Sequence, residues 1–337
     1  MQETPRLDEL DRSIIARLKQ DAHVTNRALA ESEGVTEQTI AARIRRLEDA
    51  DLLRVLGMLD AKAAGYGLFV IVGIQVAGRT PGEVAEELAA LPNVNGINSC
   101  LGGFELMAAL YARDQRDLFE LLEKKIGAIR GVEELESFLV LERVHHRTDW
   151  AKLDRLAPRE LPADEQRPLD DLDRAIVAQL QDDARTSLRE VGRRLGRSEG
   201  TIRARVRRLE EEGLCRIQAV TDVSIGPGTS SGWIAIKARR GAVRRVAETI
   251  AKAPEAGFVG ITLGRFDVMA LVSAPGREQL SRLMFEHVAL LAGVQRLEAW
   301  ETLAVYKHDF RIVDLSVARG EPSVPKPRAA GRNKRRA

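Results

Sequence analysis

Apolar side chains recur with the period of an α-helix in the N-terminal segment of the chain. One helix is predicted over 8–20, a short second helix ends near Gly34, and a third begins after Thr36, a good N-cap residue. The third helix carries one apolar stripe that must pack on the first two. The residues of these apolar faces are Leu10, Ile14, Ile15, Leu18, Ile40, Ile44 and Leu47.

Beyond this segment the pattern changes to short apolar runs, typical of strands, interrupted by two amphipathic segments. The predicted order is β-α-β-β-α-β after one short strand, which is the split βαβ, ferredoxin-like arrangement. Such a sheet has one open face that another element must cover. The strands are expected over 53–59, 67–76, 94–101, 104–112 and 132–144, and the helices over 81–91 and 115–129.

The whole pattern occurs twice, at a constant shift of 162 residues from Leu7 to Leu169. A repeat of this size is a duplicated module, because solenoid repeats have much shorter periods. The fold class is therefore expected to be α+β, with two copies of a three-helix winged or helix-turn-helix domain followed by a βαββαβ ferredoxin-like sheet domain. The expected domains are helix-turn-helix 1 over 1–56, sheet domain 1 over 57–147, a linker over 148–168, helix-turn-helix 2 over 169–218, sheet domain 2 over 219–312 and a basic disordered tail over 313–337.

The third helix of each half carries small residues, amide or hydroxyl groups and arginines on the face opposite its apolar stripe. Small residues allow close approach, and arginine can bind phosphate or guanine edges with two hydrogen bonds. Three helices with a tight glycine turn before the last indicate a helix-turn-helix whose third helix enters the major groove of double-stranded DNA. The predicted DNA contacts are Thr36, Gln38, Thr39, Ala42, Arg45, Arg46, Ser198, Gly200, Thr201, Arg203, Arg207 and Arg208.

Two further arginines on the third helices leave two interpretations open. Arg43 and Arg205 flank the apolar stripe and could contact DNA. They could equally pair with Asp11 and Asp173 in the first helix of their module and hold the module together.

Charge separates the two helix-turn-helix segments. Residues 24–54 hold five arginines and six acidic residues, whereas residues 186–216 hold nine arginines and five glutamates. Phosphate attraction grows with the number of neutralised charges. The second module is therefore expected to carry more of the DNA affinity, and Arg207→Ala should matter more than Arg45→Ala.

Composition changes this picture little. An apolar content of 44%, a charged content of 30% and a net charge of +2 are ordinary for a globular protein. No signal peptide or membrane-spanning run is evident. Cys100 and Cys215 occupy non-equivalent positions, which favours two buried small hydrophobes in a reducing, cytoplasmic setting. The tail over 319–337 carries seven basic residues against one glutamate and is expected to be disordered, with either a solubilising role or a non-specific attraction to nucleic acid.

No catalytic or metal-binding constellation is recognised, so neither an enzyme nor a cofactor or metal site is expected. His145 and His146 end a predicted strand and are expected at the surface. The runs Gly102-Gly-Phe-Glu105 and Gly264-Arg-Phe-Asp267 are more informative. A hairpin turn explains the glycine, but it does not explain why both halves retain an acid next to an aromatic residue.

Each half resembles the leucine-responsive regulator/AsnC family of bacterial and archaeal transcription regulators. The resemblance rests on the opening Leu-Asp-x-x-Asp-Arg-x-Ile, on Arg-x-Arg-Arg-Leu-Glu in the third helix, and on the Gly-x-Phe-acid turn in the sheet domain. It covers about 7–144 and 169–306. The resemblance implies a DNA-binding helix-turn-helix joined to a sheet domain that dimerises and binds an amino acid or related small effector.

In this family effectors bind where sheet domains meet, close to the Gly-x-aromatic-acid turn. The effector site implied by the resemblance comprises Gly102, Phe104, Glu105, Gly264, Arg265, Phe266 and Asp267. The first half departs from the family pattern with Glu105 and an extra glycine, which puts its site in doubt. One chain is then expected to act as a covalent pseudo-dimer that associates further into a homo-oligomer, without a membrane partner.

Two alternatives from other classes remain. Siroheme decarboxylases are built from paired domains resembling the same family, although the turn strands here lack histidine. The chain could also be an amino-acid-binding module that has lost DNA binding.

Overall fold

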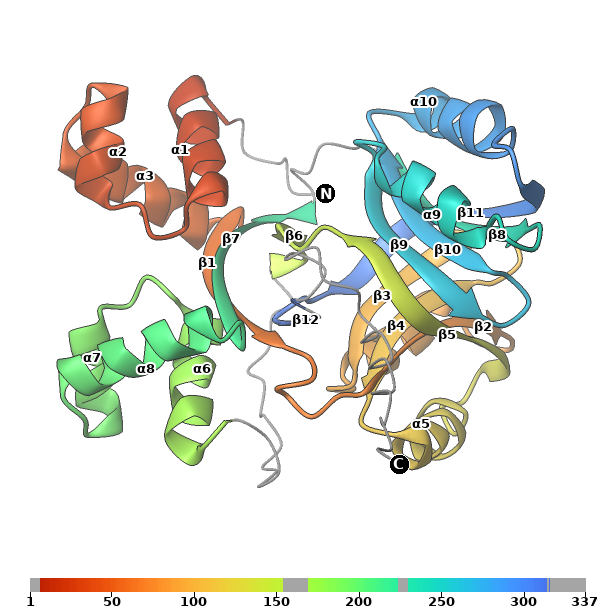
Figure 1. Cartoon of the computed structure of the whole chain (residues 1–337), viewed down its shortest axis with the longest axis horizontal. Helices are drawn as coiled ribbons and strands as arrows, with labels where there is room; N and C mark the ends of the chain where they lie inside the picture. The colour runs from red at the N-terminus through yellow and green to blue at the C-terminus, as the bar shows by residue number, and fades with distance from the viewer. Residues whose placement is uncertain (1–6, 154–168, 224–229, 314, 316–337) are drawn as a thin grey trace, which may run out of the picture.

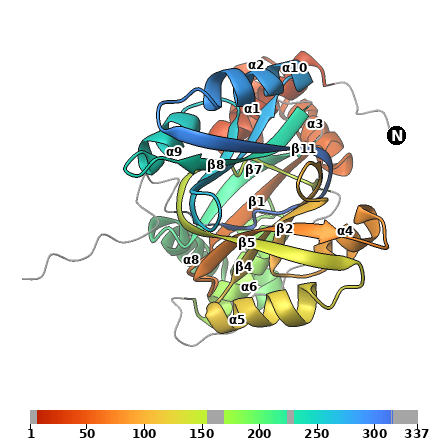
Figure 2. The same ribbon diagram turned by 90° about the vertical axis from the view of Figure 1, so that its right-hand side faces the viewer.

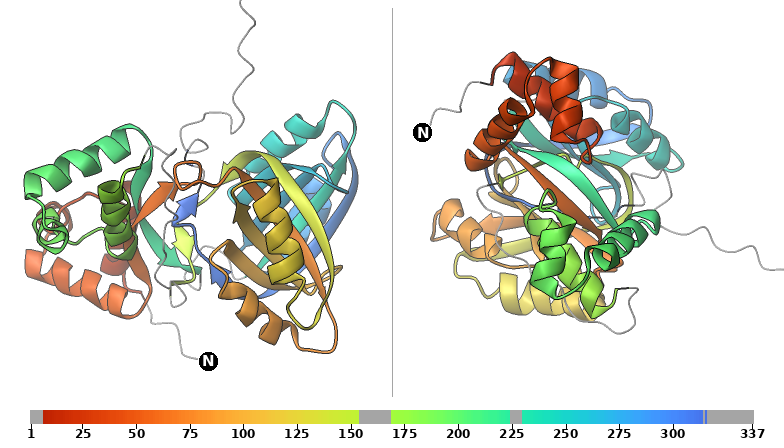
Figure 3. Two further views of the ribbon diagram at one scale, coloured as in Figure 1. Left: turned by 90° about the horizontal axis from the view of Figure 1, so that it is seen from below. Right: turned by 90° about the vertical axis from the view of Figure 1, so that its left-hand side faces the viewer.

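The computed structural model describes residues 7–153, 169–223, 230–313 and 315. Two helix-turn-helix modules lie side by side at one end of the molecule, and a strand barrel lies at the other (Figure 1). A small sheet, here called the central sheet, joins them, as Figure 3 shows from below. The duplicated α+β architecture predicted from the repeat is confirmed.

Each helix-turn-helix module contains three helices that begin at side-chain caps. The N-cap residues are Asp8, Thr25 and Thr36 in the first module and Asp170, Ser187 and Ser198 in the second. All of these side chains accept a hydrogen bond from a backbone N–H of the first turn, as N-caps do. The helices are α1 (Glu9–Gln20), α2 (Asn26–Glu33), α3 (Glu37–Asp49), α6 (Asp171–Asp182), α7 (Leu188–Leu195) and α8 (Glu199–Glu211).

The central sheet has the order β12-β1-β7-β6. β1 and β7 come from different halves and run antiparallel, and each crosses a predicted domain boundary, at 56/57 or 218/219. Two short strands that the sequence did not indicate, β6 and β12, extend this sheet at its edges. The strands are β1 (Leu53–Asp60), β7 (Cys215–Asp222), β6 (Trp150–Ala151) and β12 (Ile312–Val313).

The sheets of the two halves close into one eight-stranded barrel of order β10-β8-β11-β3-β4-β2-β5-β9. Closure depends on the two longest strands, which pair first within their own half and then with the other half, β5 with β9 and β11 with β3. The strands are β2 (Leu68–Val76), β3 (Val94–Leu101), β4 (Leu106–Ala112), β5 (Val132–His146), β8 (Ser230–Ala238), β9 (Ala256–Leu263), β10 (Val268–Ala274) and β11 (Val294–His308).

Helices cover the outside of the barrel (Figure 2). Each predicted second helix of a sheet domain is an α-helix that continues as a π-helix of i→i−5 bonds, for example from Gly127 N to Leu122 O at 2.7 Å. One apolar core fills the barrel interior and continues into the second helix-turn-helix module, and two others lie between the barrel and its helices. The helices are α4 (Pro81–Ala89), α5 (Gln115–Glu120), α9 (Val243–Ala251) and α10 (Arg277–Arg282), with π-helices at Leu121–Ile126 and Leu283–Val288.

The ends of both halves differ from the expected linker and tail. The first residues of the predicted linker belong to the central sheet, where Ala151 and Leu153 are buried. Val313 and Leu315, predicted to lie in the tail, are also buried. These apolar side chains pack with Leu56 against the central sheet, which explains why they are ordered. The rest of the predicted linker and tail lies outside the described residues.

Candidate nucleic-acid interface and effector turns

The third helix of each module, α3 or α8, exposes the face predicted to meet DNA. The opposite stripes are buried, with Ile40 and Ile202 fully removed from solvent. Arg45 and Arg207 lie on the exposed face together with Gln38, Ala42 and Gly200. The predicted orientation of both helices is confirmed, because their apolar residues face the module core.

The hydroxyl groups predicted as DNA contacts form hydrogen bonds with each other and with the backbone at the start of the helix. Thr36 Oγ1 accepts from the Thr39 backbone N–H at 3.1 Å and lies 2.9 Å from the Thr39 hydroxyl. Ser198 and Thr201 repeat this arrangement at the same distances. A hydroxyl can both donate and accept, so these caps remain compatible with DNA contact, which stays a prediction.

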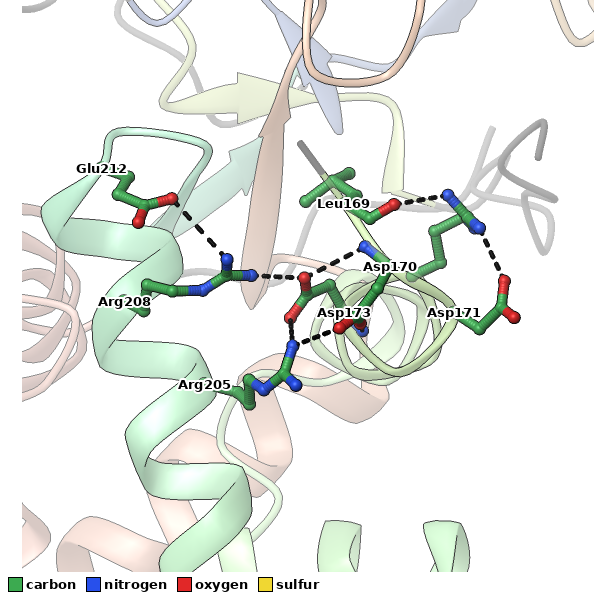
Figure 4. Close-up of polar contacts among 8 residues, drawn as sticks. Leu169, Asp170, Asp171, Asp173, Arg205, Arg208 and Glu212 are labelled. Carbon is green, nitrogen blue, oxygen red and sulfur yellow. Dashed lines mark hydrogen bonds and ion pairs between the residues drawn. The ribbon is translucent and has the colours of Figure 1, made fainter. Parts of the chain in front are cut away.

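A buried aspartate in the first helix of each module holds two arginines of the third helix. In the second module, Asp173 accepts from Arg205 Nη1 at 3.0 Å and from Arg208, as Figure 4 shows. Arg205 also bonds to Asp170 at 2.5 Å. Burial of a charge is tolerated when it is paired and hydrogen-bonded. This network therefore fixes α8 against α6.

The first module has the same network. Asp11 accepts from Arg43 at 3.1 Å and from Arg46. The backbone N–H of Asp11 and the guanidinium of Arg43 lower the pKa of Asp8 to about 2. Of the two interpretations left open for Arg43 and Arg205, the structure therefore supports the one in which they hold the module together.

These networks change the role of two predicted DNA contacts. Arg46 and Arg208 are anchored on the buried aspartates, although the Arg46 side chain remains 53% exposed. Arg45 has no ion pair within the described part of the chain, and Arg207 lies 3.7 Å from Glu211 with its side chain 74% exposed. Arg203 pairs with Glu199 one turn away. Arg45 and Arg207 are thus the arginines best placed to meet a phosphate or a base.

The two modules are fixed to each other across the central sheet. α6 packs on β1 and α1 packs on β7, so each first helix contacts a strand of the other half. Leu180 lies so close to β1 that a Cβ at Gly57 would come within 2.7 Å of the leucine Cβ. Ala184 N bonds to Val55 O at 2.9 Å. The third helices α3 and α8 contact β1 and β7, so both modules are attached to the same central sheet (Figure 3).

The Gly-x-Phe-acid turns lie against aromatic residues of the barrel. Gly102 and Gly264 have φ values of +147° and +156°, which favour glycine. A Cβ at Gly102 would lie 2.3 Å from Trp300, and one at Gly264 would lie 3.0 Å from Phe138. Phe138 and Trp300 are equivalent under the 162-residue shift, and this pair of aromatic residues is the sequence signal that marks the contact.

The acid and the aromatic of each turn have structural roles. Glu105 Oε2 accepts from Val76 N at 3.0 Å, and Asp267 accepts from Ala238 N at 2.9 Å and from Lys237 Nζ at 2.9 Å. Each carboxylate therefore binds the last residue of the neighbouring strand, β2 or β8. Phe104 and Phe266 point into the barrel and are buried, so their rings fill the core.

Arg265 is bound by one glutamate from each half. It donates two hydrogen bonds to Glu136 at 2.9 Å, and its Nη1 donates to both carboxylate oxygens of Glu298 at 3.1 and 3.3 Å. The guanidinium lies 4.5 Å from the centre of the Phe266 ring. Glu136 and Glu298 are equivalent positions, whereas the equivalent of Arg265 is Gly103. The two turns therefore differ: the second is bridged by an arginine and the first is not.

The described residues show aromatic side chains packed through the barrel interior. Phe104 and Trp300 are 5.3 Å apart between ring centres, Phe266 and Trp300 are 6.1 Å apart, and Phe138 and Phe266 are 6.0 Å apart. The interior of the barrel is therefore filled by packed side chains from both halves. In the described part of the chain, no group of three His, Cys, Asp or Glu residues is arranged to hold a metal ion.

Comparisons with known families match both kinds of domain. A winged helix-turn-helix DNA-binding family matches residues 7–54 and 169–214. An Lrp/AsnC ligand binding domain matches residues 69–150, and a C-terminal dimeric alpha+beta barrel domain matches residues 237–315. Among the described residues, no helix is long and apolar enough to cross a membrane.

Curated relatives correspond in length to one half of the chain. An HTH-type transcriptional regulator of Pyrococcus abyssi (strain GE5 / Orsay) is 38% identical over 131 residues, which are 39% of this chain and 83% of that protein. The HTH-type transcriptional regulator LrpA of Pyrococcus horikoshii is 30% identical over 139 residues, which are 41% of this chain and 99% of that protein.

A solved structure shares the duplicated fold. The siroheme decarboxylase NirDL aligns with a TM-score of 0.63 and 18% identity, covering 89% of this chain and 93% of its own. At this identity the likeness concerns the fold alone. Taken with the matched domains and the relatives, the two modules and the two sheet domains show that this chain belongs to the Lrp/AsnC family, in a tandem duplicated form.

Proposed function

We propose that this chain is a sequence-specific DNA-binding transcription regulator that responds to an amino acid or related small metabolite. The observation that carries the proposal is the pair of recognition helices, α3 and α8, fixed by the β1–β7 pairing with Arg45 and Arg207 exposed. A rigid pair of helices can contact two neighbouring half-sites on duplex DNA. One chain would then do what usually takes two subunits.

The two helix-turn-helix modules are proposed to differ in their affinity for DNA. The second module has the larger excess of arginines, and Arg189 and Arg197 are also exposed beside α8. More neutralised phosphates give higher affinity and a steeper dependence on salt. The second module is therefore proposed to anchor the chain, and the first to add selectivity.

The effector is proposed to bind where sheet domains of neighbouring chains meet, near the turns at Gly102 and Gly264. The matched Lrp/AsnC ligand binding domain supports a small-molecule effector. The first turn is proposed as the better site, because Gly103 stands where the Arg265 side chain bridges two glutamates at the second turn. This reverses the order of preference expected from the resemblance and stays a proposal.

Fluorescence anisotropy with labelled duplexes from the region upstream of the chain's own gene would test DNA binding. Arg207→Ala should weaken binding about tenfold, since one lost phosphate or base contact is worth about 1–3 kcal/mol. Arg45→Ala should have a smaller effect. The control is Arg116→Ala, an 89% exposed arginine on the barrel. An equal and negligible effect of all three variants would contradict the proposal and favour a binding module without DNA activity.

A second candidate function is a tetrapyrrole-converting enzyme, favoured by the duplicated fold shared with NirDL. The structure offers an argument against it, because Phe104, Phe138, Phe266 and Trp300 pack together inside the barrel. Adding siroheme to the purified full chain tests it. A stoichiometric change in the visible spectrum would support the enzyme, and an unchanged spectrum would exclude siroheme binding.

A further inference from the structure

A surface cleft on the second half of the barrel is built differently from its counterpart in the first half. It lies between α9 and the α10/π-helix pair, which run over the outer face of the barrel (Figures 1 and 2), and it has a cavity volume of about 350 Å³. Binding sites for small molecules usually have a volume of about 300 Å³ or more. None of the turn residues assigned to the effector lines this cleft.

The floor of the cleft is aliphatic. Ile250 comes from α9, and Leu283 and Val288 come from the π-helix. All three are buried. Binding of a compact apolar group against these side chains would remove apolar surface from water, which is favourable.

The rim of the cleft is polar and contains a strong anion-binding group. Arg282 donates to Glu278 at 2.6 Å, and a guanidinium has five N–H donors, so further donors are available for a ligand. Gln279 and His287 lie on the same wall, and Glu255 lines the opposite side. Within the described residues, the side chains of Glu255 and His287 have no hydrogen bond or ion pair.

The equivalent surface of the first half carries its charges at different positions. At the 162-residue shift, Glu120 stands in place of Arg282 and Asp117 in place of Gln279. Asp117 is held at the surface by Arg113, whose backbone N–H and guanidinium bond to it at 2.9 and 3.1 Å. Lys125 stands in place of His287 and Asn93 in place of Glu255, so the first half has a cation at another position of this rim. An arginine beside the aliphatic floor is found in the second half only.

We propose that the cleft between α9 and the α10/π-helix pair binds a small organic anion with a compact aliphatic body. The body would cover Ile250, Leu283 and Val288, and Arg282 would bind the anionic group. A charged hydrogen bond to an anion is stronger than a neutral one. The proposal does not depend on DNA binding or on the turns at Gly102 and Gly264.

The test uses the full chain labelled with ¹³C at isoleucine methyl groups and titrated with 4-methylpentanoate. The expected result is a saturable shift of the Ile250 methyl signal and no shift for Ile126, the buried last residue of the π-helix of the first half. The uncharged isostere 4-methylpentanamide should bind about tenfold more weakly, because it cannot form the charged contact.

Variants locate the binding site. Arg282→Gln should raise the Kd for 4-methylpentanoate about tenfold. The Arg282 side chain is 59% exposed, so we expect the variant to keep the fold. Lys124→Gln, on the first π-helix and 69% exposed, is the matched control and should leave the Kd unchanged. Equal binding of acid and amide, a stationary Ile250 signal, or an unchanged Kd in Arg282→Gln would each overturn the proposal.

Discussion

Asp11 and Asp173 occupy equivalent positions in the two halves, and both are fully removed from solvent. Each accepts hydrogen bonds from two arginines of the third helix. A single residue therefore connects the core of the module to its third helix. Loss of the aspartate charge would remove the buried ion-pair partner of two guanidinium groups.

Asp173→Asn should lower the free energy of unfolding of the second module by about 3 kcal/mol, because breaking a buried ion pair is strongly destabilising. Urea unfolding followed by circular dichroism measures this loss. The matched control is Asp171→Asn, since Asp171 is 97% exposed and pairs only with Arg174 in Figure 4. The control should change stability by no more than about 0.5 kcal/mol. Equal effects of the two variants would contradict the assigned role.

His146 and His308 are a second equivalent pair, and they lie where the barrel meets the central sheet. His308 is 3% exposed and its ring is 4.2 Å from Trp150 and 4.3 Å from Phe310. His146 packs on Phe310 at 4.5 Å. The prediction of a surface role for His146 is wrong, because the strand continues to this residue and turns the ring into an aromatic cluster.

Burial lowers the pKa of both histidines, and that of His308 to about 3. An ordinary histidine in the unfolded chain has a pKa near 6.5. The folded state therefore binds fewer protons, so the stability that is present above about pH 6.5 is lost as the pH falls. His308 should contribute about 1.4 kcal/mol of loss per pH unit below that value.

Thermal unfolding between about pH 6.5 and pH 5 checks this slope. His308→Phe keeps an aromatic ring without a titrating nitrogen, and it should flatten the pH dependence of the Tm. His287→Gln is the control, because His287 is exposed. A slope that is unchanged in His308→Phe would show that other groups cause the acid sensitivity.

At the scale of the element, α8 contains a glycine where helices seldom have one. Gly200 is exposed in the first turn, and an added Cβ would meet only Ser198 Oγ at 3.8 Å. Gly200→Ala should therefore stabilise the second module by about 0.5–1 kcal/mol, since alanine is the better helix former.

The same substitution tests whether DNA binding requires the absence of a side chain at position 200. If Gly200 lets the helix backbone approach DNA, Gly200→Ala should weaken DNA binding while the Tm rises. Anisotropy and thermal unfolding of one preparation measure both. Unchanged DNA affinity together with a higher Tm would remove Gly200 from the interface and leave its presence unexplained.

Periodicity predicted most elements, because amphipathic helices and buried strands must repeat their apolar positions. β3 was predicted with its observed bounds, Val94–Leu101. β6 and β12 were missed, because two-residue strands have no period to detect. The π-helix at Leu121–Ile126 was missed because its apolar pattern resembles that of an α-helix.

The candidate site shows the same limit. The apolar stripe of α3 located the exposed face, but it could not show that Arg46 bonds to Asp11, since that contact joins residues 35 positions apart in sequence. The acid of each turn was noticed but not explained. Its partner, Val76 N or Ala238 N, is a backbone group that leaves no trace in the sequence.

At the scale of the whole molecule, the duplication is what closes the barrel, because β5 and β11 each pair with a strand of the other half. It also leaves equivalent apolar residues on two sides of the barrel. Leu101 and Leu263 are 64% and 61% exposed, and Leu141 and Leu303 are 46% and 60% exposed. Exposed apolar residues in equivalent pairs favour association with further copies of the chain.

The double variant Leu101→Glu/Leu263→Glu should shift the chain to a smaller assembly, because charges at a buried interface are unfavourable. Light scattering after size-exclusion chromatography gives the mass of each species. Leu290→Glu is the control, since Leu290 is 76% exposed but has no leucine at its equivalent position, Ala128. A double variant with the mass of the unmodified chain would place the association surface elsewhere.

The central claim is that one chain holds two unequal DNA readers on one rigid support. Selection of bound duplexes from a random pool, with the unmodified chain, Arg45→Ala and Arg207→Ala, tests it most directly. The account predicts a site with two unequal half-sites, in which Arg207→Ala removes the stronger half-site and most of the affinity, and Arg45→Ala relaxes the weaker one. Enrichment of a perfect palindrome that both variants affect equally, or no enrichment at all, would contradict it.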